Sequence, residues 1–127
     1  MFPEKERLTS LLEDIIKETD ILFEMSEHIK TPDDFVTDMS GMIHFRACSM
    51  SLQYITECFV KIKNFCSMDY FKPYSSIPWQ SVFGMRNFLS HGYGDVDSES
   101  IFNTIKTDIP ALRKVTETML SDAKSNK

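Results

Sequence analysis

Apolar residues recur at steps of three and four through most of this chain, and this spacing constrains the fold more than any other feature. Over residues 5–29 it predicts one long amphipathic helix with acidic side chains on its outer side. No segment alternates apolar and polar residues as a strand would, and no internal repeat is present. With 127 residues, the chain is expected to form a single domain over residues 1–127.

A second long helix is expected over residues 42–65. Its expected buried stripe consists of Ile43, Ala47, Met50, Leu52, Ile55, Phe59, Val60 and Ile62. Glu57 lies among these apolar residues, and Arg46 and Arg86 are its candidate partners. The methionines and phenylalanines of the chain are expected to fill the core and the contacts between subunits.

Turn and capping residues divide the rest of the chain into shorter elements. The sequence at residues 31–34 is typical of a helix start and predicts a short helix to about residue 40, after which Gly41 breaks the chain. Residues 67–78, with two prolines and several serines, are expected to be irregular. A helix is predicted from residue 78 to the glycines at 92 and 94. Another is predicted from its cap, Asp97, to Pro110, and a last one from Pro110 to residue 120. The tail after residue 120 is expected to be frayed. The predicted fold class is all-α, an antiparallel bundle of about five helices.

The charge of the chain limits its partners. The formal net charge is −5, with a balance of −7 in residues 1–40 and +2 in residues 41–127. Nucleic-acid binders are usually more basic, so contact with RNA should be local or shared with a second subunit, and no DNA binding is expected.

The cysteines and the N-terminal sequence indicate the compartment. Three cysteines without metal-ligand spacing favour free thiols in a reducing environment. The N-terminal residues do not resemble a signal peptide, and no apolar run approaches the roughly 20 residues of a membrane span. A cytoplasmic protein without membrane attachment is therefore expected.

The residues that can carry chemistry lie in the run Arg86-Asn87-Phe88-Leu89-Ser90-His91-Gly92-Tyr93. A helix turns about 100° per residue, so Arg86 and His91 lie about 140° apart, whereas Asn87 shares a face with His91 and Ser90 with Arg86. These four side chains suit cleavage of an RNA phosphodiester without a metal. Histidine moves a proton near neutral pH, and arginine stabilises the charge that develops on the phosphate.

The run from Arg86 to His91 matches the signature Arg-Asn-x-x-x-His, and with Gly92-Tyr93 it resembles the HepT branch of the HEPN superfamily. Ile77-Pro78-Trp79 before the motif and Gly94-Asp95-Val96-Asp97 after it also resemble that family. The run Ile55-Thr56-Glu57-Cys58 departs at two positions from the Ile-Gly-Glu-Ala that is common there. The likeness covers nearly the whole chain.

This resemblance implies an HEPN-like bundle that forms a homodimer through the face that bears the motif. It implies the toxin of a type VII-like HEPN/MNT toxin–antitoxin pair, an endoribonuclease that needs neither metal nor cofactor. Arg86 and His91 would be the catalytic residues, with Asn87 and Ser90 in support. The expected partner is a minimal nucleotidyltransferase antitoxin, which silences the toxin by transferring AMP from ATP to Tyr93.

Two other functions stay open at this point. One is a non-catalytic HEPN module that binds a nucleotidyltransferase or a nucleotide, although the intact Arg86 and His91 favour the nuclease. The other is a helical dimerisation or adaptor protein, in which Arg86→Ala or His91→Ala would be silent. Asp95 and Asp97 could bind a metal, but carboxylates just before a helix are more often caps.

Overall fold

Residues 3–91 and 97–125 are described by a computed structural model, and within these residues every regular element is helical. The predicted all-α fold class is confirmed. None of the described helices is long and apolar enough to cross a membrane. The elements are α1 (Pro3–Ser26), the 3-10 turn η1 (Pro32–Phe35), α2 (Met39–Cys66), the 3-10 helix η2 (Met68–Tyr74), α3 (Trp79–His91), α4 (Ser98–Asn103), the π-helical turn η3 (Thr104–Asp108) and α5 (Ile109–Ser125).

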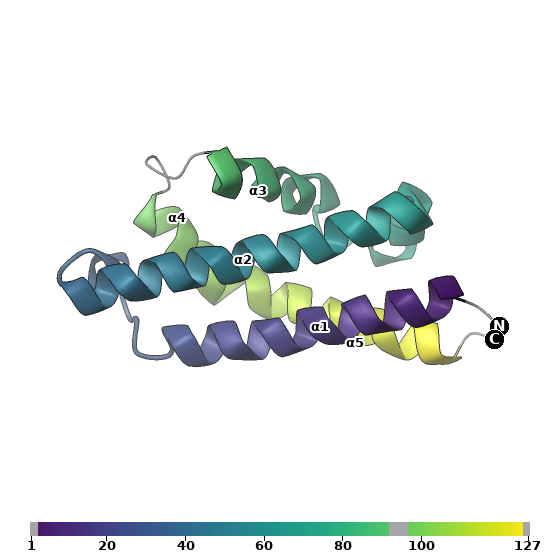
Figure 1. Cartoon of the computed structure of the whole chain (residues 1–127), viewed down its shortest axis with the longest axis horizontal. Helices are drawn as coiled ribbons and strands as arrows, with labels where there is room; N and C mark the ends of the chain where they lie inside the picture. Colours follow the sequence, from purple (N-terminus) through teal and green to yellow (C-terminus); the bar gives the residue numbers. More distant parts are fainter. Residues whose placement is uncertain (1–2, 92–96, 126–127) are drawn as a thin grey trace.

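The two long helices, α1 and α2, lie antiparallel and side by side (Figure 1). Helix α5 packs on α1, and α3 packs on another side of α2. Spacing by three and four residues puts the buried side chains of each helix on one face; α5, for example, buries Ile109, Leu112, Thr116, Met119 and Ala123. Each fully buried large apolar side chain stabilises the bundle by about 1.5–3 kcal/mol.

The prediction of a short helix that Gly41 ends is wrong. Only η1 forms there, and Gly41 lies in the first turn of α2, where its N–H donates to the N-cap carboxylate of Asp38 at 2.8 Å. A Cβ at position 41 would overlap the backbone carbonyl oxygen of Asp34. This glycine is therefore required for a close approach of two backbones, and the helix continues through it.

Three further expectations need correction. Residues 67–78 are less irregular than predicted because they contain η2. The tail is not frayed from residue 121, since α5 continues to Ser125 and the Asp122 carboxylate accepts a hydrogen bond from the Tyr74 hydroxyl at 2.7 Å. The first helix ends at Ser26, slightly earlier than predicted.

The expected buried stripe of α2 is wrong at Ile43 and Met50, and Ala47 is only half-buried. Ile43 and Met50 are 59% and 66% exposed, respectively, whereas Leu52, Ile55 and Phe59 are buried as predicted. The exposed residues lie on the side of α2 that none of the described helices covers.

The path from α4 to α5 is continuous. Asp97 caps α4, as predicted, by accepting a hydrogen bond from the Glu99 N–H at 3.0 Å. Pro110 lies in the first turn of α5. Proline has no N–H to donate to the preceding turn, as a residue inside a regular helix would, and the π-helical turn η3 lies directly before α5. Within η3, the Lys106 ammonium donates to the Ser26 carbonyl at 2.9 Å and so ties this turn to the end of α1. Burial and the neighbouring Lys30 lower the pKa of Lys106.

Trp79 is buried and anchors the start of α3 in the core. Its indole N–H donates to the Tyr74 carbonyl at 2.9 Å. Its ring packs among those of Phe59, Phe71 and Phe83. This cluster fixes α3 against α2, and thereby fixes the helix that carries the Arg-Asn-x-x-x-His run.

The cysteines are free, as predicted, with Cys48 and Cys58 buried. Burial raises the pKa of Cys48 to about 11, which keeps this thiol protonated near neutral pH.

Candidate active site on helix α3

Helix α3 carries four of the predicted site residues on a single turn and a half. Arg86 and Asn87 are exposed on this helix. The helix is described as far as His91, and the glycines at 92 and 94 that were predicted to end it lie outside the described residues. The backbones of Ser90 and His91 belong to α3, but their side chains lie outside the described residues. Tyr93 also lies outside them.

Arg86 pairs with Glu57 of α2. The Arg86 Nε–H donates to the Glu57 Oε2 at 2.9 Å, with side chains that are 48% and 34% exposed, respectively. Of the two partners considered for Glu57, Arg86 is therefore correct. Arg46 instead directs a long contact of 3.5 Å to the carbonyl of Met42. The sequence signal for this pair was a carboxylate in the middle of an apolar helix.

The Arg86–Glu57 ion pair orients the Arg86 side chain more than it stabilises the fold. Ion pairs with this exposure contribute about 0–1 kcal/mol, since water screens them. The contact nevertheless holds one edge of the guanidinium. Among the described residues Arg86 makes no further hydrogen bond, so its Nη1 and Nη2 donors are available to a ligand. That fork suits two oxygens of a phosphate.

Outside α3, two histidines and the candidate metal ligands Asp95 and Asp97 supply no second site within the described part of the chain. His28 and His44, far apart in the sequence, bring their ring centroids to 4.4 Å in an edge contact that the sequence did not predict. Among the side chains that the structure describes, which do not include that of His91, no group of three or more His, Cys, Asp or Glu is placed to hold a metal ion. Asp97 is used as a helix cap, and Asp95 lies outside the described residues.

Comparison with known proteins identifies the family. The family model described as "Ribonuclease HepT-like" matches residues 13–119, a span that includes all of α3 and its motif. The chain belongs to the HepT-like ribonuclease family. The resemblance seen in the run from Arg86 to Tyr93 is therefore confirmed at the level of the family.

Individual relatives of this HepT-like chain are named as candidate ribonucleases. One from Caldanaerobacter subterraneus subsp. tengcongensis is 34% identical over 89% of this chain and 94% of its own length. A ribonuclease HepT candidate of Thermococcus cleftensis is 31% identical over 80% of this chain and 86% of its own length. A third, from Methanocaldococcus jannaschii, is 26% identical over 89% of this chain and 96% of its own length. No solved structure matches the chain.

Proposed function

We propose that this HepT-like chain is a metal-independent endoribonuclease toxin that cleaves RNA with Arg86 and His91. The observation that carries the proposal is the complete Arg-Asn-x-x-x-His run on an exposed helix of a chain that belongs to a ribonuclease family. The exposed Arg86 guanidinium, oriented by Glu57, supports it.

In this mechanism Arg86 binds the scissile phosphate through Nη1 and Nη2 and stabilises the charge that develops on phosphorus. His91 exchanges a proton with the ribose 2′-hydroxyl or with the leaving 5′-oxygen. The 2′-oxygen loses its proton as it attacks phosphorus, the bond to the 5′-oxygen breaks, and a 2′,3′-cyclic phosphate forms. The 5′-oxygen takes up a proton and leaves as a hydroxyl; one of these two protons is exchanged with His91 and the other with water. The protonated imidazole is the form of His91 that can donate a proton to the leaving oxygen.

Glu57 is the positioning residue for Arg86, and Glu57→Gln tests this role. We expect the substitution to lower kcat for RNA cleavage by about tenfold, because the neutral amide holds the guanidinium less firmly. Thermal stability should change by less than about 1 kcal/mol. Steady-state kinetics and thermal melts, with the exposed Glu24→Gln as a matched control, check both statements. Equal kcat values for the two variants would contradict the role.

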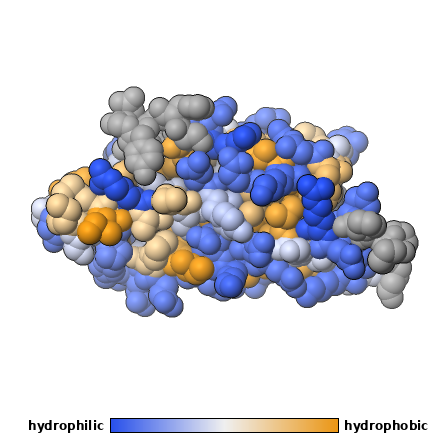
Figure 2. All heavy atoms as spheres, viewed as in Figure 1, coloured by the Kyte–Doolittle hydropathy of each residue, from blue (hydrophilic) through white to orange (hydrophobic). Residues whose placement is uncertain are grey.

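A homodimer supports the proposed function because the acidic chain has little positive charge of its own. Exposed apolar residues follow one face of α2, and this α2 stripe consists of Met39, Ile43, Met50 and Tyr54. Figure 2 shows apolar side chains gathered over the first half of α2, at the left of the view. Tyr54 lies one turn before Glu57, so the stripe leads to the Arg86–Glu57 pair. A second copy that covers the stripe would bring two Arg86 side chains toward one cleft.

Met50→Glu tests this arrangement. Wild type is expected to have about twice the chain mass of 14.7 kDa in solution, and Met50→Glu is expected to be monomeric because it buries a charge in an apolar contact. Light scattering measures the mass. Met68→Glu, an exposed methionine of η2 outside the stripe, serves as the control and should stay dimeric. A monomeric wild type, or a dimeric Met50→Glu, would contradict the α2 stripe as the interface.

Silencing is proposed to occur at Tyr93 through a minimal nucleotidyltransferase antitoxin. The Tyr93 hydroxyl oxygen attacks the α-phosphorus of ATP, pyrophosphate leaves, and the phenolic proton is released to solvent. The added phosphate places negative charge next to the site and repels an RNA phosphate. Mass spectrometry after incubation with ATP and the antitoxin should find AMP on wild type and none on Tyr93→Phe.

Expression in bacteria tests the proposed function in a cell. Wild type without an antitoxin should arrest growth and degrade RNA, whereas His91→Ala should do neither at the same protein level. Equal harmlessness of the two proteins would favour the non-catalytic HEPN module over the nuclease.

A further inference from the structure

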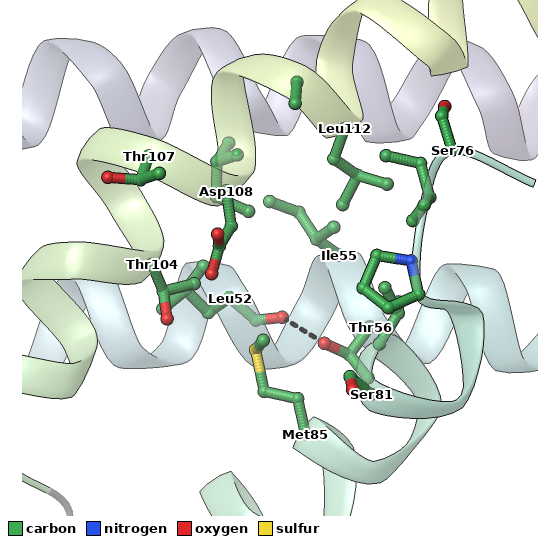
Figure 3. A pocket seen from close by; sticks show the side chains of 15 residues that line it. Leu52, Ile55, Thr56, Ser76, Ser81, Met85, Thr104, Thr107, Asp108 and Leu112 are labelled. Atoms are coloured by element: carbon green, nitrogen blue, oxygen red, sulfur yellow. Dashed lines mark hydrogen bonds between the residues drawn. The ribbon is translucent and has the colours of Figure 1, made fainter.

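A cavity of about 440 Å³ lies between α2, α3 and the path from η3 to α5 (Figure 3). Leu52 and Ile55 of α2 line one side, and Met85 of α3 lines another. The volume falls in the range of about 300–1,000 Å³ that is typical of small-molecule sites.

Two local features keep this space open. Small residues, Ser76, Ser81 and Ala111, stand at its wall where larger side chains would fill it. The π-helical turn η3 contributes Asp108 and Thr104, which Figure 3 shows on the side across from Met85. Turns of this kind are often found at functional sites.

The lining defines the chemistry of the ligand. The lining is mostly aliphatic, so the interior can bury the apolar part of a ring. The Asp108 carboxylate is exposed and forms no hydrogen bond or ion pair with the described residues, whereas the Thr56 hydroxyl is already used by the Leu52 carbonyl at 2.9 Å. A carboxylate only accepts hydrogen bonds at neutral pH, so the ligand must bring N–H donors on an apolar ring.

Among the nucleobases, guanine fits this requirement best. Its N1–H and its N2 amino group are adjacent donors that the two oxygens of a carboxylate can accept together. Adenine and cytosine place an acceptor beside their amino group, and uracil places its single N–H between two carbonyls, so each would set an acceptor against the carboxylate. These three bases should therefore bind more weakly than guanine.

The cavity is also adjacent to the candidate active site. Met85 lines the cavity and Arg86 follows it in α3, while Thr56 lines the cavity and Glu57 follows it in α2. The cavity wall and the Arg86–Glu57 pair are thus joined by two peptide bonds, one on each helix. A nucleotide next to the bound phosphate could place its base here.

We propose that the cavity between α2, α3 and η3 is a base-specificity site that binds a guanine of the RNA substrate through Asp108. This inference rests on the proposed ribonuclease function. It predicts that the enzyme cleaves preferentially next to guanosine.

The test separates binding from cleavage. Titration of the ¹⁵N-labelled full chain with guanosine, adenosine, cytidine and uridine should give at least about tenfold tighter binding of guanosine. Asp108→Asn and the pocket-filling Ser81→Leu, both at exposed positions, should each lose this preference. Asp33→Asn, an exposed acid in η1, is the matched control and should keep it. Sequencing of the ends produced from a random RNA should show guanosine at the cut in wild type and a weaker bias in Asp108→Asn.

Each contrary outcome has a distinct meaning. RNA cleavage with equal binding of the four nucleosides, or with identical behaviour of Asp108→Asn and Asp33→Asn, would overturn the base site and leave the proposed function standing. Asp108-dependent guanosine binding without any RNA cleavage would overturn the proposed function and with it the role of the cavity in RNA recognition.

Discussion

Arg86→Ala is expected to slow RNA cleavage by about a hundred- to a thousandfold, the effect typical of removing one donor that stabilises transition-state charge. Arg86→Lys should recover only a small part of the rate, because an ammonium keeps the charge but lacks the planar fork. Purified proteins and a labelled RNA give the rates. Since the Arg86–Glu57 pair is half exposed, the melting temperature of both variants should stay close to that of wild type.

Arg7→Ala is the control for Arg86→Ala. Arg7 lies in the first turns of α1, with its guanidinium over the Phe65 ring at 4.6 Å. The substitution Arg7→Ala therefore removes the same positive charge as Arg86→Ala, but at a place away from α3. It should leave the cleavage rate within about twofold of wild type. Equal losses in Arg7→Ala and Arg86→Ala would mean that the chain uses its arginines only as general positive charge.

Gly41→Ala is expected to lower the free energy of unfolding by about 3 kcal/mol, the largest effect on stability among the substitutions considered. The added methyl group would overlap the Asp34 carbonyl oxygen, which belongs to the backbone and cannot rotate away. Either η1 or the first turn of α2 must move. A fall in melting temperature of roughly 10 °C, measured by circular dichroism, is the expected result.

Gly84→Ala is the matched comparison, because both glycines lie inside helices. A Cβ at position 84 has no neighbour within 4 Å among the described atoms, so alanine should stabilise α3 by about 0.5–1 kcal/mol. If both glycine variants shift stability in the same direction and by similar amounts, the close approach of Gly41 to Asp34 is not the cause.

The sequence predicted the long helices well because their burial follows a local period. Leu12, Ile15 and Leu22 repeat at that period and are all fully buried in α1. The spacing of apolar residues does not show whether another helix covers a given face of α2. It therefore predicts burial for Ile43 and Met50, which are exposed. The role of Gly41 could not be predicted either, because a glycine is required there for the close approach to the Asp34 backbone. No local sequence pattern indicates that contact.

The candidate site was predictable to a different extent. The motif around Arg86 stood out through its resemblance to a family, whereas its spacing alone indicated little. The Arg86–Glu57 contact joins residues 29 positions apart, and the sequence could only name it as one of two alternatives. The cavity beside η3 had no sequence signal, since a π-helical turn and the space it borders depend on how α3 packs on α2 and how α5 packs on α1.

The central claim is that Arg86 and His91 cleave RNA without a metal, and one measurement tests it most directly. The initial rate of cleavage of a labelled single-stranded RNA is compared for purified wild type and His91→Ala in the presence of excess EDTA. The mechanism predicts that wild type cleaves under these conditions and that His91→Ala is at least about a hundredfold slower. Equal rates for the two proteins, or cleavage by wild type that EDTA abolishes and Mg²⁺ restores, would contradict it.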